Sequence, residues 1–556
     1  MKGEGVKRTI LLAVAAAAAV TFTACEGRED PLAEAREAIT ADGLREHTEI
    51  LSADSFQGRS PSSVGEDRTV AYLEREFAAL GLQPANGDRY VQEVPLVAIT
   101  PDRVSFSVRG DGGTSQFTWG PDFVAWTKRV TESVDVNNSD MVFVGYGIVA
   151  PEYDWNDYAG LDVHGKTVVM LVNDPGFATK DPALFTGDAM TYYGRWTYKF
   201  EEAARQGAAA AIVIHETEPA SYPWGVVEAG WVGEQFDLVS PDDNMSRVPI
   251  ESWISSETAR ALFDRAHLDF ETLKARAATR EFKAVPLRLQ ASFSVHNRLR
   301  RSTSRNVAAV VPGSTHPDEY VIYMAHWDHL GMDTTLTGDQ IYNGAQDNAT
   351  GTAGLLVLAK AFMTVEPRPE RSIVFLAVTA EEQGLLGSAY YAMNPLFPLD
   401  HTVAAINMDV LNVYGPTRDI TVVGLGQSEL DDYLADAAKA QGRTIRPDPT
   451  PSAGSYYRSD HFNFAKAGVP ALYPDAGVDN IEHGEAWAKE QAERYRADQY
   501  HKPADEYDPN WNLDGAVQDL DLVFAVGYRL ATERTWPNWK SGSEFRARRD
   551  SMMAAR

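Results

Sequence analysis

Continuous apolar runs bounded by polar turns mark the second half of the chain. Residues 320–324, 373–378 and 403–406 are almost entirely apolar, a pattern typical of strands that are buried on both faces of a largely parallel sheet. Residues 351–362 are mostly small and aliphatic, which predicts a buried helix. We therefore expect an α/β fold whose central sheet is mixed, largely parallel and flanked by helices.

Two helical and two strand-like segments precede residue 140. Apolar residues recur at three- and four-residue spacing near both ends of 32–82, which predicts helices separated by the turn-rich loop 55–61. Alternating apolar and polar residues near 90–97 and 104–108 predict two strands of a half-exposed sheet.

Residues 140–293 have the pattern of a separate, β-rich insert. Strand-like runs lie at 141–149, 166–172 and 208–214, and a helical segment ends at Gly207, a residue that often stops a helix. The aromatic residues Tyr192, Tyr193, Trp196 and Tyr198 could contact a substrate, but packing within the insert is the favoured prediction.

The first 31 residues carry a targeting pattern. Residues 1–24 have a basic start, an apolar core and small residues before Cys25, which predicts a secretory signal peptide. The position of Cys25 resembles a bacterial lipoprotein cleavage site. We expect an exported protein of the periplasm or outer membrane, tethered by 25–31 and held at a membrane only through a lipid on Cys25. Plain secretion after an ordinary signal peptide is the alternative.

The composition excludes one class of partner. The chain has 556 residues, enough for two or more cores, and a formal net charge of −28. A surface with this excess of carboxylates repels phosphate backbones, so no nucleic-acid partner is expected.

Polar groups follow the predicted strands or precede the predicted helix. They are His326 with Asp328, Asp347, Glu381 with Glu382, and Asp409. Ligands gather beyond the carboxyl ends of parallel strands, so these side chains should converge there. Taken alone, Asp347 could be a helix N-cap, and two adjacent glutamates could be a solvated helix start. Together with a histidine they indicate metal.

Ligand preference extends this set. A bridging carboxylate can hold two divalent ions roughly 3.5–4 Å apart. If each ion also takes a nitrogen and another carboxylate, two histidines are needed. His326 is one, and His501 is offered late in the chain.

These residues, in this order, resemble the M28 family of di-zinc peptidases, in its aminopeptidase branch. The similarity covers roughly 32–139 and 294–537. The insert resembles a protease-associated domain through Gly145-Tyr146-Gly147 and residues 199–213. The resemblance implies a peptidase domain in two parts, 32–139 and 294–537, a protease-associated insert at 140–293 that walls the substrate cleft, and a C-terminal tail at 538–556.

The resemblance also implies roles for the site residues. Asp347 would bridge two zinc ions, although cobalt or manganese could fill the same ligand set. One ion would be completed by His326 and Asp409, and the other by Glu382 and His501. The remaining roles go to Asp328, which would orient His326, to Glu381 as general base, and to Tyr500, which would steady an oxyanion.

The implied activity is the removal of N-terminal residues from peptide substrates. A carboxypeptidase or dipeptidase of the same family stays open, as does an inactive peptide-binding lipoprotein. The M20 carboxypeptidases place a domain between the last acid and the last histidine, and the 92 residues from Asp409 to His501 leave little room for it. A serine hydrolase would need a Gly-x-Ser-x-Gly elbow, and none is present.

Several further polar residues are expected to be structural. His329, His461 and His483 are predicted to be packed or supporting histidines rather than ligands. Asp505 could support His501, and the basic segment 546–549 is predicted to be a solvated end.

Overall fold

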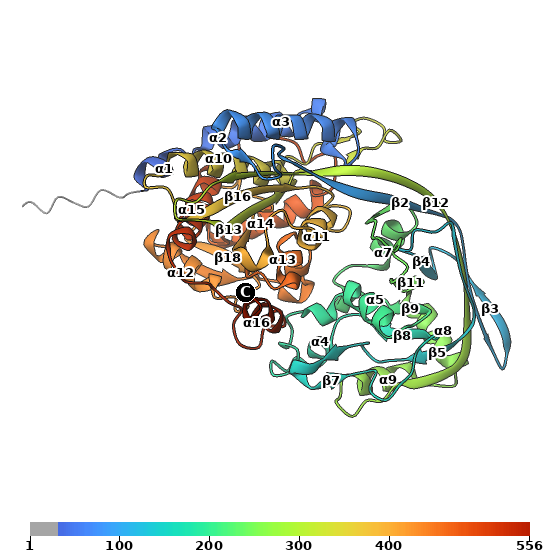
Figure 1. Ribbon diagram of the computed structural model, residues 1–556. Helices are drawn as coiled ribbons and strands as arrows, with labels where there is room; N and C mark the ends of the chain where they lie inside the picture. The colour runs from blue at the N-terminus through green and yellow to red at the C-terminus, as the bar shows by residue number, and fades with distance from the viewer. Residues whose placement is uncertain (1–31) are drawn as a thin grey trace, which may run out of the picture.

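The structure, a computed structural model, describes residues 32–556, and Figure 1 shows that they form two lobes. The predicted signal peptide 1–24, Cys25 and the tether 25–31 lie outside the described residues. Among residues 32–556, none of the helices combines the length and the apolar character needed to cross a membrane.

Three buried strands form the centre of the first lobe. β13 (His316–His326) pairs in parallel with β16 (Arg371–Val378) and with β17 (Thr402–Asn407). Successive side chains of β13 alternate between two cores: Val321 and Tyr323 join one apolar cluster, and Ile322 and Met324 join another. Burial on both faces explains why the sequence lacks alternation here. The predicted parallel strands are confirmed.

The sheet is mixed, as predicted. β12 (Val285–Val311) pairs antiparallel with β16, whereas β20 (Ala471–Asp475) pairs in parallel with β17 and antiparallel with β18 (Asp419–Val423). β19 (Thr444–Pro447) closes this end of the sheet beside β18. The fold class is therefore an α/β sheet with helices on its faces (Figure 1).

Helices of the first lobe come from both ends of the chain. The predicted buried helix is α10 (Thr350–Thr364), and Ser63 and Gly81 flank α3 (Val64–Leu80) as N-cap and left-handed C-cap. The other helices of this lobe are α1 (Ala33–Glu37), α2 (Ala41–Leu51), α11 (Leu386–Met393), α12 (Leu430–Ala440), α13 (His461–Ala467), α14 (Gly484–Asp498), α15 (Asp514–Thr532) and α16 (Arg546–Ala554).

One long strand replaces the two strands predicted before residue 110. β2 (Val91–Gly110) pairs antiparallel with β12 along almost its whole length, and the two strands run together from the first lobe into the second (Figure 1). The register shifts between His296 and Asn297, where Asp102 has no partner residue on β12. Pairing with β12 keeps the intervening segment extended, a long-range effect that local alternation does not reveal.

The second lobe takes in most of residues 140–293 (Figure 1). Its strands β8 (Thr167–Leu171), β9 (Ala210–Ile214) and β11 (Ile250–Ile254) are parallel and buried, and α5 (Trp196–Arg205) precedes β9. The lobe also includes β3 (Gly113–Phe117), β4 (Phe123–Trp126), β5 (Ser133–Phe143), α7 (Trp224–Trp231), α8 (Ser256–Arg265) and α9 (Phe270–Ala277). Its apolar core takes in Phe106 and Val136, which precede the predicted boundary at residue 140. β10 (Gln235–Leu238) pairs with β2, and its Leu238 shares an apolar cluster with Ala380 and Leu386 of the first lobe.

The lobes touch again at the C-terminal side of the first lobe. Glu544 accepts hydrogen bonds from the backbone N–H of Tyr192 and from the hydroxyl of Tyr457, each at 3.1 Å. Lys466 pairs with Glu201 at 2.7 Å. The second lobe is therefore fixed both by the β2–β12 pair and by this contact.

The prediction of a solvated basic end is wrong. Residues 546–554 form α16, and Arg549 is buried with Nη2 donating to the carbonyl of Thr402 at 3.1 Å. The guanidinium satisfies a carbonyl at the start of β17, so part of this basic segment belongs to the core.

Candidate metal centre

The predicted polar groups converge beyond the carboxyl ends of the central strands. His326 ends β13, Glu381 and Glu382 follow β16, and Asp409 follows β17. Asp347 lies in the turn Ala345–Ala349 that leads into α10, and its own backbone is not helical. Parallel strands end at the same edge of a sheet, so segments far apart in the sequence deliver their side chains to one place.

The carboxylate of Asp347 lies between two imidazoles. Its Oδ1 is 3.3 Å from Nε2 of His326, and its Oδ2 is 3.2 Å from Nε2 of His501. Each imidazole faces a second carboxylate as well: Oδ1 of Asp409 lies 3.2 Å from His326, and Oε2 of Glu382 lies 3.0 Å from His501. The structure thus brings the five predicted ligands into two groups that share Asp347.

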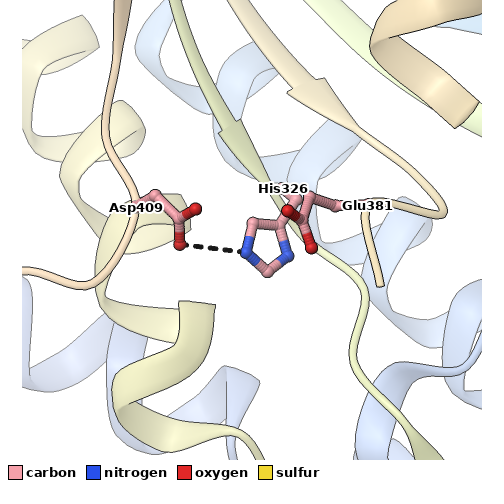
Figure 2. Close-up of side chains that lie close together, drawn as sticks. All are labelled: His326, Glu381 and Asp409. Atoms are coloured by element: carbon pink, nitrogen blue, oxygen red, sulfur yellow. Dashed lines mark hydrogen bonds and ion pairs between the residues drawn. The ribbon is translucent and has the colours of Figure 1, made fainter. Parts of the chain in front are cut away.

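Glu381 joins the first of these groups. One donor atom each of His326, Glu381 and Asp409 lie within 4.8 Å of one another. Figure 2 shows Asp409 on one side of the His326 ring and Glu381 toward the other. The carboxylate of Glu381 therefore belongs to the group around His326.

Asp328 supports the glutamate pair more than the histidine. Its carboxylate accepts hydrogen bonds from the backbone N–H groups of Glu381 at 3.1 Å and Glu382 at 3.4 Å. The same carboxylate is 3.9 Å from Nδ1 of His326, and that nitrogen is closer, at 3.1 Å, to the carbonyl oxygen of Asp328. Asp328 thus orients His326 through its carbonyl and the Glu381–Glu382 pair through its carboxylate.

The sequence suggested that Asp505 could support His501, but Asp505 instead contacts the turn that carries Asp347. Its carboxylate accepts hydrogen bonds from the backbone N–H groups of Gln346 and Asp347, each at 3.0 Å, and from the hydroxyl of Tyr495 at 3.2 Å. Asp505 therefore fixes the turn that carries Asp347.

Two supporting contacts were not predicted. His329 is fully buried, and its Nδ1 lies 2.6 Å from Oε1 of Glu382, the oxygen that faces away from His501. The hydroxyl of Ser459 donates to Oδ2 of Asp409 at 2.6 Å. The His326-x-Asp328-His329 sequence was visible, but only the fold shows which carboxylate His329 meets.

Burial and neighbouring charges set the protonation of the centre. Burial alone would lower the pKa of His326, but the carboxylates of Glu381 and Asp409 outweigh it and hold that pKa well above its ordinary value. Burial is likewise outweighed for His501, whose contacts with Asp347 and Glu382 raise its pKa to about 10. Burial raises the pKa of Glu381, with Glu382 and Asp409 adding to the effect. The protein alone thus retains protons that a bound cation would displace.

The residues fit a pair of divalent cations. Nε2 of His501 is buried and makes no hydrogen bond, although two carboxylate oxygens lie within 3.2 Å. Imidazole nitrogens and carboxylate oxygens are ordinary zinc ligands, and tetrahedral donors about 2.0–2.1 Å from zinc stand roughly 3.3 Å apart. The facing donors are 3.0–3.3 Å apart, so the spacing and the donor chemistry agree.

The other predicted residues lie around this cluster. The ring of Tyr500 stacks on His501 with 3.9 Å between centroids, and its side chain is exposed. His461 is buried against Tyr456 and Tyr473 and makes no contact with the cluster, as predicted. His483 is exposed and packs on Trp487.

Comparisons with known proteins give the same family. Residues 306–525 match Peptidase family M28. The mouse protein Aminopeptidase NAALADL1 is 38% identical over 130 residues, which are 22% of this chain and 16% of that protein. Aminopeptidase YwaD of Bacillus subtilis (strain 168) is 27% identical over 241 residues, which are 42% of this chain and 46% of that protein. The Glutamate carboxypeptidase 2 homolog of Caenorhabditis elegans is 36% identical over 125 residues, 22% of this chain and 15% of that protein.

The chain therefore spans from about a sixth to just under half of the length of these relatives. Among solved structures, an aminopeptidase from Aneurinibacillus sp. strain AM-1 aligns with 90% of this chain and 97% of its own, at 19% identity and a TM-score of 0.48. The matched segment 306–525 contains both histidines and all the carboxylates of the cluster. The segment that holds the cluster therefore matches peptidase family M28.

Proposed function

We propose that this chain is a di-zinc exopeptidase that removes N-terminal residues from peptides. The observation that carries the proposal is the position of Asp347, whose two oxygens each face one histidine. His326 and Asp409 would hold one ion, and Glu382 and His501 the other. The names of the mouse and Bacillus relatives favour the N-terminal end of the substrate.

The residues of the chain would divide the chemistry as follows. Two divalent ions, when bound, supply Lewis acidity that brings the pKa of a water to roughly 7 and polarises a peptide carbonyl. Glu381 would accept the proton of that water and return it to the leaving amine. Its burial raises its pKa, which helps the carboxylate to keep the proton between the two transfers. Tyr500, stacked on His501, would steady the charge that develops on the carbonyl oxygen.

The second lobe would act as a protease-associated domain that walls the substrate site. Its Met190 donates a backbone hydrogen bond to the carbonyl of Pro451 at 3.2 Å, and Tyr192 packs on Phe462. Between those two positions lies Ser459, which contacts Asp409. The insert therefore borders the segment that supports one of the proposed ligands.

Substrate choice can be tested with zinc-loaded protein. Aminoacyl-p-nitroanilides and free peptides should be hydrolysed, peptides with a blocked N-terminus should not, and a chelator should abolish turnover. Cleavage of N-blocked peptides at their carboxyl end would instead support the carboxypeptidase alternative, which the name of the Caenorhabditis relative favours. Zinc binding without any cleavage would favour a peptide-binding protein.

The ligand set can be tested separately. His501→Ala should lower the zinc content from two ions per chain, because His501 is the nitrogen donor of one group. His483→Ala is the matched control, since that histidine is exposed and touches neither group. Unchanged stoichiometry in His501→Ala would assign the ligand to another residue.

We also propose export and lipid anchoring through Cys25, which rests on the sequence pattern of residues 1–25. Wild-type protein expressed in a bacterium should incorporate labelled palmitate and Cys25→Ser should not. Unlabelled wild-type protein in the culture medium would favour plain secretion.

A further inference from the structure

Arg59 is a fully buried arginine that precedes the family-matched segment 306–525 by more than two hundred residues. It ends the turn Asp54–Arg59, which lies between α2 and α3. Both Gly58 and Arg59 have a positive φ, 62° and 49°. This backbone shape turns the arginine away from solvent and toward the ligand-bearing loops of the first lobe.

The turn is pressed closely against a hairpin of the first lobe. A Cβ added to Gly58 would lie 2.3 Å from the carbonyl oxygen of Gly331 and 2.5 Å from that of Tyr342. These residues belong to the hairpin of β14 (Gly331–Met332) and β15 (Ile341–Tyr342). Only glycine allows this approach, so the turn is built to bring Arg59 next to the segments on either side of the hairpin.

The guanidinium of Arg59 holds two of those segments together. Nε donates to the carbonyl of Trp327 at 2.8 Å, Nη1 to that of Asn343 at 2.6 Å, and Nη2 to that of Gly344 at 2.8 Å. Nη1 also donates to the carbonyl of Leu51 at 2.8 Å. Trp327 directly follows His326, and Gly344 begins the turn that carries Asp347.

The charge of Arg59 also suits its place. Burial lowers its pKa to about 10, against the opposing effect of Asp505, Asp328 and Asp347, so the side chain stays protonated at neutral pH. The planar fork reaches three carbonyls on two segments in fixed directions, which the single ammonium of a lysine cannot reproduce.

We propose that Arg59 is a positioning residue of the metal centre, which sets the spacing between His326 and Asp347 by tying together the backbone beside each. The inference rests on the proposed function, because the spacing matters through the ions that the two side chains would share. It makes the N-terminal segment 32–82 part of the metal centre, although no proposed ligand comes from it.

Arg371 provides a matched control for the loss of a buried arginine. It too is buried, and it donates to the carbonyls of Leu530 at 2.6 Å and Thr535 at 3.1 Å. It begins β16, whereas the metal centre lies beyond the other end of that strand. Replacing it should therefore weaken the fold without altering the ligands.

The test measures zinc affinity by competition with a chromogenic chelator, for full-length wild type, Arg59→Gln, Arg59→Lys and Arg371→Gln. Outer groups that orient metal ligands typically contribute 10- to 100-fold to affinity. We expect a loss in that range for Arg59→Gln, a smaller loss for Arg59→Lys, which keeps the charge, and wild-type affinity for Arg371→Gln. Circular dichroism and thermal unfolding of the metal-free proteins report the fold.

The outcomes separate the inference from the proposed function. Wild-type protein that binds no zinc would refute the proposed function itself. Wild-type protein that binds zinc, with Arg59→Gln equal to it or no weaker than Arg371→Gln, would refute the positioning role alone. If neither Arg59 variant folds while Arg371→Gln does, Arg59 serves the fold and the positioning role is also overturned.

Discussion

Each lobe buries a cluster of charged groups, and the two clusters differ in the hydrogen-bond partners of those groups. In the second lobe, Nζ of Lys199 donates to the carbonyls of Tyr146 and Asn173 at 2.6 and 2.8 Å. The carboxylate of Asp174 accepts from the hydroxyl of Thr191 at 2.7 Å and from three backbone N–H groups. Buried polar groups of a stable core normally have such partners.

In the cluster of the first lobe, a buried nitrogen lacks such a hydrogen-bond partner. Nε2 of His501 makes no hydrogen bond, and Asp347, Glu381, Glu382 and Asp409 crowd around two imidazoles. An excess of buried negative charge is costly unless a cation balances it. The two clusters therefore differ in the groups that face their carboxylates: Lys199 and backbone N–H groups face Asp174, whereas Asp347, Glu382 and Asp409 face imidazole nitrogens, which are common metal ligands.

The largest difference between the clusters should appear in turnover. Glu381→Gln should lower kcat by roughly 10²- to 10⁴-fold, the usual contribution of a general base, while the zinc content stays the same. Glu251→Gln is the control, because Glu251 is a buried glutamate of the second lobe whose pKa burial raises to about 7. Turnover of Glu381→Gln equal to that of the control would remove Glu381 from the proton transfer.

For the cluster around Lys199 in the second lobe, we expect a loss of stability rather than a loss of turnover. Lys199→Met leaves Asp174 and two carbonyls without their buried cation, and breaking a buried pair on one side typically costs about 3–5 kcal/mol of unfolding free energy. Urea denaturation should show this loss, and zinc affinity should not change. The exposed Lys489, replaced by Met, is the control. A loss of zinc in Lys199→Met would mean that the lobes are energetically coupled.

A smaller effect distinguishes two equally buried histidines. His329→Phe removes the contact with Oε1 of Glu382 and should lower zinc affinity by roughly 10- to 100-fold. His461→Phe should leave zinc affinity unchanged, since His461 packs against Tyr456 and Tyr473 rather than against a proposed ligand. Equal affinities in the two variants, measured by chelator competition, would return His329 to a packing role.

The smallest predicted effect is a pH dependence of the metal-free protein. The folded chain raises the pKa of His501 to about 10, from an ordinary value of about 6.5. The stability that this histidine contributes is complete below pH 6.5 and is lost as the pH rises toward 10. The Tm of metal-free protein should therefore fall between pH 6.5 and 9.5. Bound zinc replaces the proton, so the stabilisation by zinc should grow over the same range.

The variant His501→Asn tests the origin of this pH dependence. Its metal-free form should lose less Tm between pH 6.5 and 9.5 than the wild type does, because the titrating group is absent. Equal slopes for the two proteins would assign the dependence to other groups of the cluster, such as His326.

The sequence predicted the fold best where the apolar pattern within a single strand determines how that strand is buried. The apolar runs that become β13, β16 and β17 are buried on both faces, so their pattern is local, and the polar residues that follow them were predicted correctly to converge. The single strand β2 was missed because its middle is kept extended by pairing with β12, about two hundred residues later.

The supporting residues of the centre were harder to predict than its proposed ligands. The guanidinium of Arg59 donates hydrogen bonds only to backbone carbonyls. The carboxylate of Asp505 accepts hydrogen bonds only from backbone N–H groups and from the hydroxyl of Tyr495. Backbone partners carry no side-chain signature, so no spacing or residue type in the sequence points to them. The fold alone shows which carbonyl or N–H lies within reach.

The paired strands β2 and β12 form a continuous connection between the two lobes (Figure 1). Cross-strand pairing links β2 and β12 over most of their length, so the connection between the lobes is a paired ribbon rather than a single extended chain. The register of this pair shifts beside Asp102, and an extra residue of this kind typically bends and twists a strand pair locally. Deletion of the exposed Asp102 should restore regular pairing at this position and change the angle between the lobes, which small-angle X-ray scattering would detect.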